Sequence, residues 1–319
     1  MKQLRRYGLV LLLAALLPLG ASAQTPDEQD TILREFLWQN FINQPADKRP
    51  KIGLALSAGG VRGFAHVGTL EALSNAGLPV DMISGTSMGA IVGALYAAGL
   101  PTDKLWDISS HLSLKSITSD YNVMGLFRFF FAKKLPSSAN LADFFFSQLG
   151  DIQFEDLKIP FSCAAMDIKT GERIVFNSGP LAIAVRASMN LPGVFAPVEY
   201  RHRKLVDGAV VDYLPVESVK KMGADYIIAS VTPPDFFSTT PKTVAAYLLR
   251  VGDVRGAAMI EESAQKANFV LTNRVVNVGT LELDKLHQAG EVGIVEAHQH
   301  LEDLQQSLLL FALPYVLKK

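Results

Sequence analysis

The chain contains the run Gly85-Thr86-Ser87-Met88-Gly89 between an apolar stretch, residues 80–84, and an alanine-rich stretch, residues 90–98. A strand, then Gly-x-Ser-x-Gly, then a helix is typical of a nucleophile elbow, a turn so tight that glycines must flank the serine. The turn would hold the Ser87 hydroxyl at a helix N-terminus, where free N–H groups favour negative charge. The same five residues also occur in ordinary turns with a capping serine, but the flanking patterns favour a nucleophile.

A second glycine cluster follows residues 52–57, which have the pattern of a buried strand, and reads Gly59-Gly60-Val61-Arg62-Gly63. Apolar residues at helical spacing come next, and Asn75-Ala76-Gly77 ends the predicted helix. Such a turn leaves backbone N–H groups unpaired, and they can bind an anion. The glycine spacing and the Gly-Lys-Ser/Thr ending of nucleotide-binding loops are both missing, so an oxyanion hole is favoured. Arg62 would either order this loop or contact a lipid phosphate.

A serine nucleophile needs a base, and none of the six histidines lies in a motif that marks a triad histidine. His66 falls on the helix after the glycine cluster, where a packing role is favoured. Asp207 ends an apolar strand and precedes Gly208, at the position where open α/β sheets bind their ligands. Asp207 is therefore the better candidate, although an Asp-Gly pair taken alone is also a common turn.

Three blocks stand in one order: the Gly59–Gly63 loop, the Gly85–Gly89 elbow, and Asp207-Gly208-Ala209. In this combination the chain resembles the patatin-like phospholipase family, over roughly residues 51–231. Ala209 stands where many members have glycine, and the part after about residue 240 matches less well. Three further segments resemble the same family: residues 154–160, 165–172 and 186–198.

The resemblance implies an α/β fold, a three-layer α/β/α sandwich with a mainly parallel central sheet, distinct from the α/β-hydrolase fold. It also implies a Ser–Asp dyad without a catalytic histidine, in which Ser87 is the nucleophile and Asp207 the general base. The oxyanion hole would be formed by Gly59, Gly60, Val61, Arg62 and Gly63. Because a carboxylate is a weak base for a hydroxyl, the site would have to desolvate Asp207 and raise its pKa.

The activity that the resemblance implies is hydrolysis of phospholipids or other acyl-ester lipids through an acyl-enzyme. No metal or other cofactor is expected, because the sequence has no zinc-ligand spacing and no calcium-loop pattern. Two alternatives stay open: an acyltransferase that uses the same dyad, and a non-catalytic lipid- or protein-binding module. The presence of both Ser87 and Asp207 argues against the second.

Composition supports a large core and excludes one class of partner. The chain has 319 residues, of which 49% are hydrophobic, and a formal net charge of −1. This balance gives no long-range field for nucleic acid. The run Phe127-Arg128-Phe129-Phe130-Phe131, followed by Lys133-Lys134, suits transient contact with a membrane surface or an acyl-chain pocket, or else a core-facing helix.

The N-terminus has the features of a signal peptide. Basic residues precede an apolar run at residues 8–17, and Ala21-Ser22-Ala23 offers a cleavage site. The run is short for a membrane span, so cleavage near Ala23 is favoured over an uncleaved anchor. We therefore expect an exported protein, periplasmic or secreted. Its predicted parts are a signal peptide at 1–23, a leader at 24–50, and one catalytic domain with a helical C-terminal part at 51–319.

Outside the motifs, the pattern predicts ordinary scaffold elements. Cys163, the only cysteine, lies in an apolar strand and is expected in the core. Helical patterns cover residues 30–41, 102–150 with an interruption near Pro136, 241–267 and 286–311; strand patterns cover residues 225–231 and 269–276.

Overall fold

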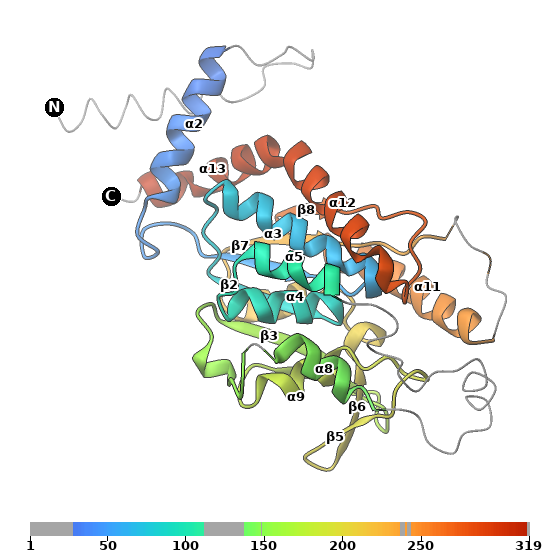
Figure 1. The fold of residues 1–319 in the computed structure, drawn as a ribbon. Coiled ribbons are helices and arrows are strands. Elements are labelled where there is room, and N and C mark those ends of the chain that lie inside the picture. Colours follow the sequence, from blue (N-terminus) through green and yellow to red (C-terminus); the bar gives the residue numbers. More distant parts are fainter. Residues whose placement is uncertain (1–27, 112–136, 148, 237–239, 241–243, 318–319) are drawn as a thin grey trace.

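The computed structural model describes residues 28–111, 137–147, 149–236, 240 and 244–317 (Figure 1). Within them, eight strands form one sheet in the order β5-β6-β3-β2-β1-β7-β8, with β4 paired to β3. Parallel pairing joins β3 (Phe161–Asp167), β2 (Met82–Thr86), β1 (Ile52–Leu56), β7 (Tyr226–Val231) and β8 (Phe269–Thr272). Antiparallel pairing adds β4 (Arg173–Phe176), β6 (Arg203–Asp207) and β5 (Val198–Tyr200).

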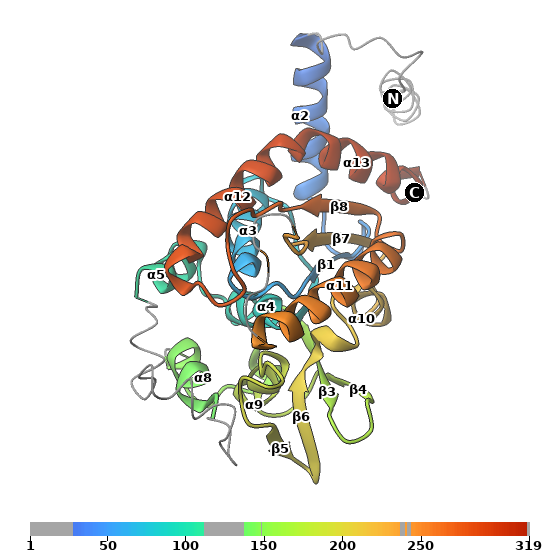
Figure 2. The ribbon, with the colours of Figure 1, turned by 90° about the vertical axis from the view of Figure 1, so that its right-hand side faces the viewer.

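Helices cover both faces of the sheet (Figure 2). One layer contains α3 (Ala65–Asn75), α4 (Met88–Ala97), α5 (Thr102–His111), α9 (Leu181–Ser188) and α12 (Leu286–Gln299). The opposite layer contains α10 (Val216–Lys221) and α11 (Val244–Ala264). The remaining helices are α2 (Glu28–Ile42) and α13 (Leu301–Leu317), beyond the β8 edge, and α8 (Ala139–Phe146), beside α9. The expected three layers and mainly parallel sheet are confirmed.

Burial on both faces explains the composition of the central strands. Every residue of β1, β2, β3 and β7 is buried. A parallel sheet with helices on both sides needs such continuous apolar strands, because neither face meets water. Cys163 lies in β3, fully buried in the main apolar cluster, as expected. Burial raises the pKa of its thiol above the usual range.

Small residues allow α12 to pack directly on α3. A Cβ at Gly293 would overlap the carbonyl oxygen of Ala65, and a Cβ at Gly68 would overlap that of Gly290. The two helices therefore meet backbone to backbone. This contact fixes α3, the helix that follows the glycine loop, against α12.

The helical pattern at residues 286–311 forms two helices instead of one, which corrects the prediction. His300 interrupts them with φ −108 and ψ 7. The tertiary reason is that α12 follows α3, whereas α13 turns to pack on α2. The other patterns are found with shifted ends: 30–41 as α2, 241–267 as α11, and 269–276 as the shorter β8. The region 102–150 contains α5 and α8.

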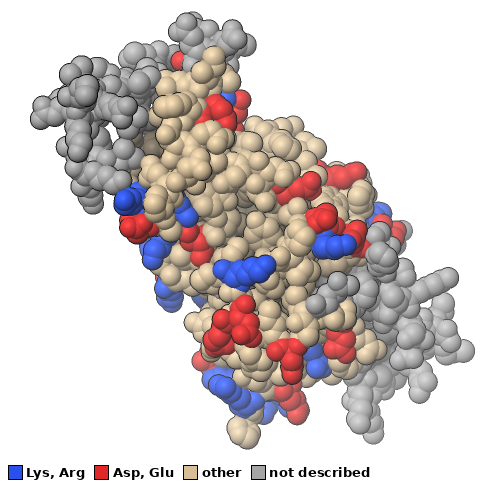
Figure 3. All heavy atoms as spheres, turned by 60° about the vertical axis from the view of Figure 1, so that its left-hand side comes forward, with Lys and Arg blue, Asp and Glu red and all other residues tan. Residues whose placement is uncertain are grey.

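Three predicted features lie outside the described residues: the signal peptide at 1–23, the aromatic and lysine run at 127–134, and the interruption of the helical pattern near Pro136. Among the helices of the described part, none combines the length and apolar character needed to cross a bilayer. On the face shown in Figure 3, acidic and basic side chains are interspersed among neutral ones.

Candidate active site

Ser87 forms the tip of the turn between β2 and α4, with φ 56 and ψ −121. A non-glycine residue in this region is strained, and such strain is held only where the surroundings determine it. The two flanking glycines allow the turn to close. A Cβ at Gly85 would overlap the carbonyl oxygen of Gly89, and a Cβ at Gly89 would overlap those of Leu56 and Ser57. The strand, tight turn and helix predicted around Ser87 are present.

The other two residues of the elbow hold it in place. The Thr86 hydroxyl donates to the carbonyl oxygen of Asp212 at 2.8 Å. Met88 is buried, and its side chain lies against Gly63, where any Cβ would collide with it. The elbow is therefore tied both to the segment after Asp207 and to the glycine-rich loop.

Asp207, at the end of β6, meets Ser87 although 120 residues separate them. The Ser87 hydroxyl donates to Asp207 Oδ2 at 2.6 Å, and the N–H of Ala209 donates to Oδ1 at 2.8 Å. Because β6 pairs with β3 and β3 with β2, the ends of β6 and β2 lie close together. Gly208 permits this approach, since a Cβ there would overlap the carbonyl oxygen of Ala164 in β3.

Burial gives Asp207 the electrostatic character of a base. Its side chain is fully buried, and Ser87 is only 6% exposed. Removal from water raises the pKa of Asp207 to about 7, against the lowering effect of its hydrogen bonds from Ser87 and Ala209. A general base works best when its pKa lies near the operating pH.

Residues 188–190, which the sequence did not place in the site, hold the backbone of Ser87 and of Asp207. The Ser87 N–H donates to Ser188 Oγ at 3.1 Å, and the Asp207 N–H donates to the carbonyl oxygen of Asn190 at 2.9 Å. The Asn190 side chain accepts from the Ser138 hydroxyl at 2.6 Å. The only sequence signal for these residues was the family resemblance of residues 186–198.

The glycine-rich loop forms the 3-10 turn η1 (Gly60–Phe64) directly after β1. Gly59 and Gly60 precede the first helical bond, and their N–H groups donate to no acceptor within the described part of the chain. The N–H of Val61, by contrast, donates to the carbonyl oxygen of Thr280 at 3.0 Å. Of the five predicted oxyanion residues, Gly59 and Gly60 therefore have amides available for an anion, whereas the Val61 amide is already used.

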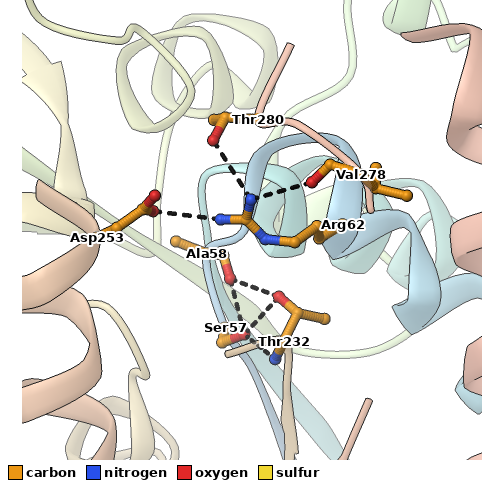
Figure 4. Close-up of polar contacts among 7 residues, drawn as sticks. All are labelled: Ser57, Ala58, Arg62, Thr232, Asp253, Val278 and Thr280. Atoms are coloured by element: carbon orange, nitrogen blue, oxygen red, sulfur yellow. Dashed lines mark hydrogen bonds and ion pairs between the residues drawn. The ribbon is translucent and has the colours of Figure 1, made fainter. Parts of the chain in front are cut away.

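Arg62 anchors the loop through contacts with Asp253, Val278 and Thr280 (Figure 4). Its side chain is 4% exposed; Nη2 pairs with Asp253 of α11 at 3.2 Å, and Nη1 donates to the carbonyl oxygen of Val278 at 3.3 Å. The same nitrogen, Nη1, also donates to the hydroxyl oxygen of Thr280. These partners favour the loop-ordering role over contact with a lipid phosphate.

Among the described side chains, none of the histidines hydrogen-bonds to Ser87 or Asp207. Nor do three His, Cys, Asp or Glu side chains gather there as metal ligands. The site is thus a serine, a buried carboxylate and a loop with two available amides. This set of groups can perform acyl transfer from an ester to serine.

The sequence model of the patatin-like phospholipase family matches residues 54–220, which include the loop, the elbow and Asp207. The chain belongs to this family. An uncharacterized NTE family protein of Mycobacterium bovis is 36% identical over 183 residues, which are 56% of this chain and 48% of that protein. The lysophospholipase nte1 of Aspergillus fumigatus is 30% identical over 283 residues, 80% of this chain and 18% of that protein. The chain thus spans less than half the length of these relatives.

Solved structures of patatin-like proteins have the same fold. Human GIVD cytosolic phospholipase A2 superposes with a TM-score of 0.53 at 12% identity, covering 93% of this chain and 66% of that one. VipD from Legionella pneumophila superposes with a TM-score of 0.51 at 12% identity, covering 81% and 67%. At this identity the likeness concerns the fold alone.

Proposed function

We propose that this patatin-like protein is a lipid acyl hydrolase of the phospholipase A or esterase type that uses Ser87 and Asp207 as a catalytic dyad. The observation that carries the proposal is the 2.6 Å hydrogen bond from the Ser87 hydroxyl to a fully buried Asp207 carboxylate. A strained serine bonded to a carboxylate with a pKa raised to about 7 has the geometry of an activated nucleophile.

In the proposed reaction, Ser87 Oγ attacks the ester carbonyl while its proton passes to Asp207 Oδ2. The N–H groups of Gly59 and Gly60 bind the oxyanion that forms on the carbonyl oxygen. Asp207 then returns the proton to the leaving alcohol or lysolipid, and the acyl-enzyme remains. Water, deprotonated by Asp207, releases the fatty acid and regenerates Ser87. Each oxyanion donor contributes about 3–4 kcal/mol in comparable acyl transfers.

The substrate class is a phospholipid, a lysophospholipid or another acyl-ester lipid. Support comes from the names of the fungal relatives, which are lysophospholipases. The same acyl-enzyme would serve an acyltransferase if an alcohol replaced water. Addition of a primary alcohol to the assay separates the two reactions, since a dominant transfer product contradicts simple hydrolysis.

The test compares wild type, Ser87→Ala and Asp207→Asn on chromogenic acyl esters and on defined phospholipids. Ser74→Ala and Asp103→Asn, both at exposed positions of neighbouring helices, serve as matched controls. We expect activity in wild type and controls and none in the dyad variants, with folding checked by circular dichroism. Full activity in folded Ser87→Ala would refute the assignment of the nucleophile.

Contact with a lipid surface is part of the proposal, and α11 is its best candidate. Four large apolar side chains on the solvent side of this helix are 57–67% exposed: Tyr247, Leu248, Val251 and Val254. The opposite side faces the site, since Asp253 pairs with Arg62 and Gly256 lies on the Tyr213 ring. Figure 2 shows α11 in the helical layer on the side of the sheet opposite α3 and α4. Exposed apolar side chains gathered on one side of a helix are typical of an interaction surface.

Vesicle sedimentation measures this contact. Ser87→Ala protein, which leaves the lipid intact, is mixed with phosphatidylcholine vesicles containing phosphatidylglycerol. Leu248→Ser with Val251→Ser should lower the bound fraction, whereas the similarly exposed Val276→Ser with Val295→Ser should not. Equal binding of both pairs contradicts a role for α11.

Export is the remaining part of the proposal. It rests on the basic, apolar and small-residue segments before residue 24. In the exported protein, residues 51–319 would form one catalytic domain. Mass spectrometry of the protein recovered from its native host should find a mature N-terminus at Gln24. An N-terminus at Met1 contradicts cleavage.

A further inference from the structure

We infer that His66 is a positioning residue for the proposed reaction and sets the oxyanion loop through the carbonyl group of Ser57. The inference rests on the proposed function, because it concerns how the amides of Gly59 and Gly60 are aimed. His66 is not part of the dyad, and neither Ser87 nor Asp207 is among its hydrogen-bond partners.

The two ring nitrogens of His66 have different partners. His66 is the second residue of α3 and is fully buried. Nε2 lies 2.9 Å from the carbonyl oxygen of Ser57, and Nδ1 lies 2.8 Å from Ser230 Oγ. Because a carbonyl oxygen can only accept, Nε2 carries the hydrogen, and Nδ1 accepts from the Ser230 hydroxyl. Burial lowers the pKa of His66 to about 4, so the ring is neutral at pH 7.

A further buried bond fixes this tautomer. Ser230, near the end of β7, gives its one hydrogen to His66 at 2.8 Å rather than to Thr69 Oγ1, which lies farther away at 3.4 Å, and accepts from Asn273 Nδ2 at 3.0 Å. Ser230 and Asn273 are both buried. Because the Ser57 carbonyl oxygen can only accept, it sets the donor and acceptor of each bond in the chain. A flip of the His66 ring would therefore break its bonds to Ser57 and Ser230. Fully satisfied buried networks of this kind hold one conformation.

The residues that lead into the loop are held from the other side as well (Figure 4). The Thr232 N–H donates to Ser57 Oγ at 2.9 Å, and the Thr232 hydroxyl donates to the carbonyl oxygen of Ala58 at 2.8 Å. The Ala58 N–H donates to the carbonyl oxygen of Tyr213 at 2.9 Å. Ser57 and Ala58 therefore have fixed peptide planes, and the two available amides follow directly after them.

The Ser57 carbonyl also lies at the elbow. A Cβ at Gly89 would stand 2.5 Å from this oxygen, so the first turn of α4 packs on the same group that His66 holds. His66 thus sets one carbonyl that borders both the loop and the nucleophile turn. A rotation of this peptide would move the Gly59 amide relative to Ser87.

Amide substitutions separate this role from simple packing. The amide nitrogen of Gln reaches about as far as Nε2, so His66→Gln keeps a donor for Ser57. The amide of Asn reaches only as far as Nδ1, so His66→Asn keeps the partner of Ser230 and loses the bond to Ser57. Both remove the ring and should destabilise the fold to a similar degree, as measured by urea unfolding.

The kinetic test uses a soluble chromogenic ester and a fluorophosphonate that labels the active serine. We expect kcat of His66→Asn to fall about 10- to 100-fold with KM within about 3-fold, and the labelling rate to fall in parallel. His66→Gln should stay within about 5-fold of wild type, a rescue that packing alone does not explain.

Each outcome has one meaning. Equal kcat losses in the Gln and Asn variants, or a loss of stability without a change in kcat, overturn the positioning role while the dyad stands. Wild-type protein that neither hydrolyses esters nor reacts with the fluorophosphonate overturns the proposed function, and this inference with it.

Discussion

At the scale of single residues, Ser87 and Asp207 are constrained in different ways. Ser87 is held by its backbone, in a conformation that needs glycine on both sides, with the first turn of α4 beginning at the next residue. Asp207 is held by its surroundings, which exclude water and leave it two donors, the Ser87 hydroxyl and the Ala209 amide. The first constraint is local, and the second depends on the whole sheet.

The raised pKa of Asp207 predicts how activity and stability change with pH. The base must be ionised, so kcat/KM on a soluble ester should rise with pH and level off above about 7. The folded state holds this proton more tightly than the unfolded chain, whose Asp pKa is about 3.9. Stability should therefore fall as pH rises from about 4 through 7, the range between those two pKa values.

Urea unfolding of wild type and Asp207→Asn at pH 5 and pH 8 checks the sign. The Asn variant lacks this titration, so it should gain stability relative to wild type at pH 8. The same difference between the two proteins at both pH values would contradict the raised pKa.

At the scale of elements, α11 and η1 are joined by a single ion pair. Arg62 and Asp253 have side chains 4% and 17% exposed, and their closest nitrogen and oxygen lie 3.2 Å apart. A buried guanidinium left without its carboxylate is costly, whereas an exposed pair contributes little. The pair therefore locks the glycine-rich loop to a helix from the opposite layer.

We predict that Asp253→Asn, which keeps an acceptor oxygen but removes the charge, lowers the free energy of unfolding by about 1–3 kcal/mol. Glu262→Gln, which breaks a pair with Lys266 whose two side chains are 77% and 47% exposed, should change it by less than about 0.5 kcal/mol. Urea unfolding measures both. A double-mutant cycle with Arg62→Met then gives the coupling energy, and a value near zero would show that the two groups act independently.

The elements themselves were largely predictable, and the exceptions have tertiary causes. Apolar runs at 52–57 and 225–231 form strands because buried parallel strands need such runs. The break at His300 was not predictable, because the helical pattern continues through it and only the contact of α13 with α2 bends the chain. The hydrogen bond from the Val61 N–H to the Thr280 carbonyl oxygen was not predictable either, because Thr280 lies in an irregular segment more than 200 residues away in the sequence.

At the scale of the whole molecule, the site depends on strands that come late in the chain. β7 lies between β1 and β8, so the strand that carries the glycine loop gains one neighbour from residues 226–231. The same late region supplies Ser230, Asn273 and Thr280 to the support of the loop. The family match ends at residue 220, before β7 begins.

We therefore predict that a chain ending at Gly223, which contains all the family motifs, does not fold. The edge of β1 would be open and the buried faces of α3 would lose β7 and α12. Folding of the shortened chain is compared with that of the full chain by soluble yield, far-UV circular dichroism and a thermal melt. A cooperative melt of the shortened chain would mean that the late strands are dispensable.

The sequence by itself determined the local chemistry: the tight turn at Ser87, the glycine loop, the Asp-Gly at a strand end, and the class of fold. The turn, the loop and the strand ends follow from short-range sterics and from apolar patterning, which act within a few residues, whereas the class of fold came from the resemblance to the patatin-like phospholipase family. The pairing of Ser87 with Asp207 was predicted through the family resemblance, and the tertiary structure supplied its geometry. Only the tertiary structure decided that Arg62 turns to Asp253, that the Val61 amide is used, and that His66 faces Ser57. The physical reason is that these contacts join residues far apart in the chain, and their geometry depends on how helices and strands pack.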